Sequence, residues 1–227
     1  MINIVIINGS PRKNGATAGL LKEMSKYLSG KEDVNISYIN ISDYSLLNCT
    51  GCMSCYQNGV CCLNDKVEEI NALVSRAHGI IIGSPTYSST MPGSLKTYID
   101  RGHFVLEQSL SGKYTFALST YEIAGGKSVI SLLKTLYQYS GGIRAGEYTR
   151  KLPFNSSPLA STKKQQMFLK KTERYYRFIK NRKRKSLIDK IIHFVALRLI
   201  MKPQVLQRPA QYKAVIERWE KNGIIKI

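Results

Sequence analysis

The order of elements at the start of the chain constrains the fold more than any other feature. The run Ile4-Val5-Ile6-Ile7 is continuously apolar, as a strand buried inside a sheet is. Residues 8–17 are polar and contain two glycines, and residues 18–28 then follow a helical pattern. The chain therefore begins with a buried strand, a polar loop and a helix whose first backbone N–H groups lie at the end of the strand.

The loop between this strand and this helix suits a phosphate group. The positive end of a helix dipole and the unpaired N–H groups of the first turn attract an anion. Ser10, Asn14 and Thr17 add side-chain donors, while Gly9 and Gly15 let the backbone approach a ligand closely. The loop has neither the Gly-Lys-Ser/Thr ending of a Walker loop nor the Gly-x-Gly-x-x-Gly dinucleotide fingerprint. We expect a single phosphate held by hydroxyls and amides, with an ordinary capped turn as the alternative.

Strands and helices continue to alternate after this first unit. The predicted strands cover residues 4–7, 34–39, 78–83, 113–119 and 143–148, and the predicted helices cover residues 18–28, 65–76, 92–102 and 126–139. This alternation predicts a parallel sheet with helices on both faces and right-handed crossovers. Ligands bind beyond the carboxyl ends of such strands, so the loops 10–17, 85–91 and 120–126 should converge on one crevice.

Charge divides the chain into two parts. A length of 227 residues with 43% hydrophobic content fits one α/β domain with an appendage. The net charge is +19, and it is uneven, because residues 1–150 hold 14 Lys/Arg and 11 Asp/Glu whereas residues 151–227 hold 20 and 4. We therefore expect a domain over residues 1–160 and a basic helical C-terminal extension over residues 161–227, which anionic surfaces would attract.

The start of the chain and its cysteines indicate a reducing compartment. Met1-Ile2-Asn3 leads directly into the first strand, without the basic and long apolar regions of a secretory signal, so we expect a cytoplasmic protein. All five cysteines lie within residues 49–62. Such clustering in a reducing compartment favours metal or redox chemistry over disulfides.

Three motifs together resemble a known family. They are the run of residues 8–17, Gly83-Ser84-Pro85-Thr86-Tyr87, and Leu95-Lys96-Thr97-Tyr98-Ile99-Asp100-Arg101. In this order the motifs are similar to the flavodoxin-like NAD(P)H-dependent FMN reductases, including the iron–sulfur flavoproteins, over residues 1 to about 150. The resemblance implies a doubly wound, five-stranded α/β sheet with strand order 2-1-3-4-5.

The resemblance also implies where FMN binds. The phosphate would be held by Ser10, Arg12, Asn14, Ala16 and Thr17, the flavin ring would lie along Pro85, Thr86, Tyr87 and Ser88, and Thr120 and Gly125 would close over its remaining edge. Lys13 is not included, because it is as well explained by a solvated surface charge. Hydride would pass from NAD(P)H through FMN to a small-molecule or protein acceptor, with NADH and NADPH both open. The cofactor carries this chemistry, so no catalytic side chain is expected.

The cysteine spacing supports a second cofactor. Cys49-x2-Cys52-x2-Cys55-x5-Cys61 resembles the motif with which iron–sulfur flavoproteins bind a [4Fe-4S] cluster, and Cys62 is an extra thiol. Zinc and free redox-sensing thiols stay open as alternatives. If a cluster is present, the protein is expected to exchange single electrons with ferredoxin. The remaining alternative is a redox-inactive flavodoxin-fold scaffold that binds a partner.

The basic extension contains an amphipathic segment. Residues 187–201 are strongly apolar but are interrupted by Asp189, Lys190, His193 and Arg198, so the segment is too short and too charged to span a membrane. We expect it to pack on another subunit in a homodimer or homotetramer. A membrane surface with anionic lipid is the alternative. Nucleic acid is not expected, because no recognition motif accompanies the charge.

Overall fold

A single parallel sheet organises the chain. The computed structural model describes residues 1–153, 156, 158 and 161–225. The strands are β1 (Ile2–Asn8), β2 (Val34–Asn40), β3 (Gly79–Pro85), β4 (Tyr114–Tyr121) and β5 (Ile143–Lys151). They pair in the order β2-β1-β3-β4-β5, which confirms the strand order that the family resemblance implied.

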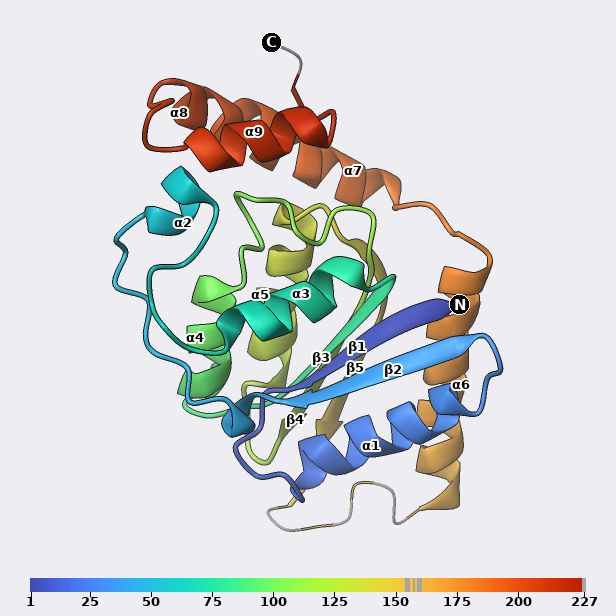
Figure 1. The fold of residues 1–227 in the computed structure, drawn as a ribbon. Helices are drawn as coiled ribbons and strands as arrows, with labels where there is room; N and C mark the ends of the chain where they lie inside the picture. Colours follow the sequence, from blue (N-terminus) through green and yellow to red (C-terminus); the bar gives the residue numbers. More distant parts are fainter. Residues whose placement is uncertain (154–155, 157, 159–160, 226–227) are drawn as a thin grey trace.

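Helices cover both faces of the sheet, as Figure 1 shows. On one face lie α1 (Ala16–Ser29) and α6 (Thr162–Lys180), and on the other lie α3 (Val67–Arg76), α4 (Gly93–Arg101) and α5 (Gly126–Tyr139). Successive side chains of a strand point to opposite faces. Ile4 and Ile6 therefore pack with α1 and α6, whereas Val5 and Ile7 pack with the other layer. Burial on both faces explains why these strands are continuously apolar.

The strand order places two loops next to each other. Asn8, the last residue of β1, pairs with Gly83 near the end of β3. From β1 the chain continues to β2 on one side and later to β3 on the other, so the order reverses between β1 and β3. A Cβ atom at Gly83 would lie 2.6 Å from Cδ1 of Leu21, so only glycine lets α1 pack this closely on β3. The loops after β1 and β3 consequently open side by side.

The last part of the chain forms a separate helical layer. It consists of α7 (Leu187–Phe194), the π-helix η2 (Val195–Met201), α8 (Lys202–Leu206) and α9 (Lys213–Lys221). Leu197, Val205, Val215 and Trp219 form a small core of their own, and α9 packs beside the short helix α2 (Ser54–Asn58) (Figure 1).

The boundary expected after residue 160 falls at residues 159–160, which lie outside the described residues. Helix α6 follows this point and packs on the sheet through Phe168 and Tyr175, and the separate layer begins with α7. Within the part of the chain that the structure describes, every helix is too short or too polar to cross a membrane.

Candidate functional site

A crevice of about 550 Å³ opens at the carboxyl ends of the strands. We call it the strand-end crevice. Most of the residues predicted to bind FMN line it, namely Ser10, Arg12, Asn14, Ala16, Thr17, Pro85, Thr86, Tyr87 and Thr120. These residues come from the loops after β1, β3 and β4, so the structure brings together three segments that are far apart in the sequence.

The loop after β1 presents a helix N-terminus to the crevice. Helix α1 begins at Ala16, and its N-cap residue Gly15 provides no side-chain hydrogen bond to the first turn. The loop itself is held by side chains, because the Asn8 Oδ1 accepts from Ser10 N at 3.1 Å and the Ser10 Oγ accepts from Arg12 N at 3.1 Å. An uncapped N-terminus on a rigid loop fits an anionic group such as the phosphate of FMN.

The other two loops form the opposite wall. Thr86 N donates to the Thr120 carbonyl at 2.8 Å, which extends the β3–β4 pairing into the crevice. The hydroxyls of Thr17 and Thr120 are 2.7 Å apart and join the first loop to the third. Tyr87 is partly exposed, and its backbone pairs with that of Thr90 through two hydrogen bonds. Backbone pairing therefore fixes this wall before any ligand binds.

Two predicted residues, Ser88 and Gly125, are absent from the lining of the crevice in the described structure. Ser88 has a positive φ of 47° in the turn that links Tyr87 to Thr90. Gly125 has a φ of 86°, and a Cβ atom there would lie 2.7 Å from Cγ2 of Thr86. Both residues shape the loops that carry the lining residues.

Part of the lining was not predicted from the sequence. Gly15, Tyr121 and Glu122 belong to the loops that were expected to converge, whereas no motif identified Gly19, Leu152, Pro153, Ser156 and Pro158. Leu152 and Pro153 directly follow β5, so the rule that ligands bind at carboxyl strand ends could have identified them.

The four predicted cluster ligands share a second cavity. Cys49, Cys52, Cys55 and Cys61 line a volume of about 250 Å³. Cys62 is outside this lining in the described structure, and its Sγ lies 3.3 Å from the Sγ of Cys52. The four thiols with the cluster-type spacing therefore share one cavity, which we call the cysteine cavity. A set of four convergent thiols fits a cubane iron–sulfur cluster.

Arg101 holds the two ends of the cysteine segment together. This buried residue at the end of α4 forms an ion pair with buried Asp65 and donates to the Leu47 carbonyl at 2.8 Å. It also donates to the Sγ of Cys61 at 3.3 Å. Burial alone would raise the pKa of Asp65, but hydrogen bonds from Arg101 and from the amides of Leu47 and Val67 outweigh it and lower that pKa below its usual value.

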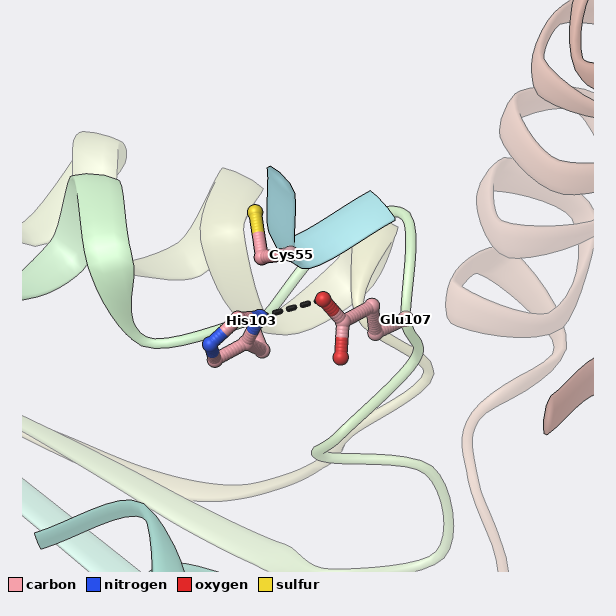
Figure 2. A group of neighbouring side chains, drawn as sticks. All are labelled: Cys55, His103 and Glu107. Atoms are coloured by element: carbon pink, nitrogen blue, oxygen red, sulfur yellow. Dashed lines mark hydrogen bonds and ion pairs between the residues drawn. The ribbon is translucent and has the colours of Figure 1, made fainter. Parts of the chain in front are cut away.

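A histidine adds a second positive charge to the cysteine cavity. Figure 2 shows Cys55, His103 and Glu107 close together, with His103 hydrogen bonded to Glu107 through Nδ1. Burial would lower the pKa of His103, but its hydrogen bonds with Cys55 and Glu107 outweigh burial and raise that pKa to about 10. His103 is therefore cationic at neutral pH. One ligand atom from each of the three residues lies within 4.8 Å of the others. The sequence analysis identified neither His103 nor Glu107.

The C-terminal helical layer contacts several residues that line the cysteine cavity. Trp219 donates its Nε1 proton to the Leu106 carbonyl at 2.7 Å, and Arg218 forms an ion pair with Glu107. The rings of Tyr212 and Tyr56 lie 5.7 Å apart, which joins the layer to α2. The basic extension thus contacts Tyr56, Leu106 and Glu107, which line the cysteine cavity.

A parallel sheet in this order, with a polar crevice at its switch point, defines a flavodoxin-like protein. The fold matches the apo form of an NADH:FMN oxidoreductase with a TM-score of 0.58 and 20% identity, over 77% of this chain and 88% of that one. It also matches a flavodoxin from the domain Archaea with a TM-score of 0.53 and 14% identity, over 79% of this chain and 99% of that one.

The chain belongs to the family of NADPH-dependent FMN reductases, whose family model matches residues 2–153. An iron–sulfur flavoprotein of Clostridioides difficile is 38% identical over 224 residues, which cover 98% of this chain and 99% of that protein. The resemblance stated from the motifs is therefore confirmed. The chain is a flavin-dependent oxidoreductase, and the family to which it belongs supports FMN as its cofactor.

The Arg101–Asp65 pair can be tested against an exposed pair on the same helix. Asp65→Ala leaves Arg101 buried without its partner, and we expect the free energy of unfolding to fall by about 3–5 kcal/mol. Asp100→Ala removes the partner of exposed Lys96, so its effect should stay below about 1 kcal/mol. Urea unfolding followed by circular dichroism measures both variants. Equal losses would show that the buried pair does not hold the cysteine segment.

Proposed function

We propose that this chain is an FMN-dependent oxidoreductase that accepts hydride from NAD(P)H and passes the electrons to an acceptor. The observation that carries the proposal is the strand-end crevice, where the uncapped N-terminus of α1 meets the loops after β3 and β4. When bound, FMN supplies a centre that accepts hydride and releases electrons in steps of one or two.

The residues of the crevice hold and orient the cofactor. The first-turn amides of α1 and the hydroxyls of Ser10 and Thr17 are placed to bind the phosphate, and Arg12 offers a guanidinium to its negative charge. The paired backbone of Pro85 and Thr86 forms a fixed edge for the flavin ring. Tyr87 is 40% exposed at the crevice, so its ring is available to shape the place where a nicotinamide stacks.

A second candidate function rests on the cysteine cavity. We propose that Cys49, Cys52, Cys55 and Cys61 bind a [4Fe-4S] cluster, which would add a one-electron carrier to the same chain. Arg101 donates a hydrogen bond to the Sγ of Cys61, and a ring nitrogen of His103 lies within 4.8 Å of the Sγ of Cys55. A full-length relative that is named an iron–sulfur flavoprotein supports this assignment. With a cluster, single-electron exchange with a ferredoxin becomes an alternative to hydride transfer.

The electron donor is tested on the FMN-loaded protein under anaerobic conditions. Addition of NADH or NADPH should bleach the flavin absorbance in a stopped-flow experiment, and the nucleotide that bleaches it faster is the preferred donor. If reduced ferredoxin bleaches the flavin but neither nucleotide does, hydride transfer from NAD(P)H is excluded and the one-electron alternative is supported; dithionite serves as the control that the flavin can be reduced.

The phosphate site is tested with two neighbouring cations. Arg12 lines the strand-end crevice, whereas Lys13 forms an ion pair with Asp43. Arg12→Ala should weaken FMN binding by about 10- to 100-fold, because it removes charge-assisted hydrogen bonds to a phosphate. Lys13→Ala should change the affinity by less than about threefold.

Fluorescence titration measures these affinities. Riboflavin, which lacks the phosphate, serves as the control ligand, and its affinity should be the same for Arg12→Ala and the unaltered protein. If Arg12→Ala weakens both ligands equally, Arg12 does not act on the phosphate.

The cysteine assignment is tested by a matched pair of substitutions. Cys55→Ser should remove the iron from anaerobically purified protein, whereas Cys62→Ser should retain about four irons per chain. The FMN content should be unchanged in both variants, because the strand-end crevice has no cysteine in its described lining. Iron that persists in Cys55→Ser, or zinc in place of iron in the unaltered protein, contradicts the cluster.

A further inference from the structure

An exposed apolar stripe runs along α7 and η2. Six large apolar side chains on this segment are at least half exposed, namely Leu187, Ile188, Ile191, Phe194, Leu199 and Ile200. Leu187, Ile191 and Phe194 are spaced by three to four residues, which places them on one side of α7, and Leu199 and Ile200 follow on η2. The opposite side is anchored, because Ala196 and Leu197 are buried against the rest of the layer. The stripe is thus presented outward on a fixed helix.

The charges beside this stripe all have one sign. Lys183, Arg184, Lys190 and Arg198 are exposed. Asp189 is the single acidic residue between positions 183 and 202, and it is buried. Arg144, Gln138 and Ser186 hold its carboxylate by hydrogen bonds. The charged side chains that the segment 183–202 exposes are therefore all positive.

We propose that this face of α7 and η2 docks on the surface of a membrane that contains anionic lipid. The apolar stripe would enter the boundary between headgroups and acyl chains, with the helix lying in the plane of the surface. The flanking Lys and Arg side chains would pair with headgroup phosphates. This role is separate from the oxidoreductase function and needs no flavin or cluster.

Charge complementarity selects a lipid surface over a second copy of the chain. A symmetric contact through this stripe would bring Lys190 and Arg198 of both copies together, and the segment exposes no acidic side chain to pair with them. An anionic bilayer offers both the apolar interior and the opposite charge. The layer also contacts Leu106 and Glu107 beside the cysteine cavity, so docking would hold that side of the molecule toward the membrane.

The test compares two exposed apolar residues. Phe194 on the stripe is 56% exposed and Met167 on α6 is 55% exposed, so substitution of either by Asp changes the charge equally at a similar exposure. Sedimentation is measured with vesicles of phosphatidylcholine alone and of phosphatidylcholine with about 30% phosphatidylglycerol. The full-length protein should bind only the second kind. Phe194→Asp should weaken this binding about tenfold or more, and Met167→Asp about twofold at most.

Salt and charge provide independent readouts. Arg198→Gln should weaken binding about fivefold, and about 1 M salt should reduce binding by the unaltered protein, because electrostatic attraction is screened. The proposal is overturned if the protein does not bind anionic vesicles, or if the Phe194→Asp and Met167→Asp variants bind these vesicles equally. If lipid binding is absent and Phe194→Asp lowers the molar mass measured by light scattering, a second copy covers the stripe instead.

Discussion

The buried ion pair between Arg101 and Asp65 is the interaction on which the cysteine region depends. A loop of this kind has almost no apolar core of its own, and its cysteines are exposed or half-buried. Hydrogen bonds from the guanidinium of Arg101 stabilise the loop instead. They are accepted by the Leu47 carbonyl, the Sγ of Cys61 and the carboxylate of Asp65. An unpaired guanidinium inside a protein raises the free energy of the folded state. If the loop moved away, Arg101 would either become exposed to solvent or stay buried without its partner. A single side chain of the main domain therefore fixes both ends of the segment that carries the four thiols lining the cysteine cavity.

The two candidate cofactor sites share one continuous stretch of chain. Residues 83–107 run from the end of β3, through the loop along the strand-end crevice, into α4 and on to the segment that carries His103 and Glu107. A displacement of α4 along its axis would therefore move both sites together. Its packing against the sheet through Leu95 and Tyr98 resists such a displacement.

The sequence predicted local and periodic features well. The strands and their covering helices follow from apolar periodicity, and convergence of the loops follows from the parallel sheet. Contacts between segments that are far apart in the sequence leave no comparable periodic pattern in that sequence. His103 and Glu107 acquire their role from Cys55, which lies nearly fifty positions earlier, and Trp219 reaches Leu106 from the end of the chain. Ser88 and Gly125 belong to the expected loops but are absent from the described lining of the crevice. Both have a positive φ, and a motif does not specify such a backbone angle.

The hydroxyls of Thr17 and Thr120, which line the strand-end crevice, can each act as a hydrogen-bond donor or acceptor. Each hydroxyl has one proton and can accept from others, and one proton is used between the two oxygen atoms at 2.7 Å. The other proton remains to be directed by whatever lies nearest. A dianionic group would accept a hydrogen bond from this second proton. A neutral donor would instead favour the orientation in which an oxygen lone pair of the threonine accepts the hydrogen bond. The hydrogen bond between these two threonines, one at the start of α1 and one near the end of β4, can therefore reverse its direction without any movement of the backbone.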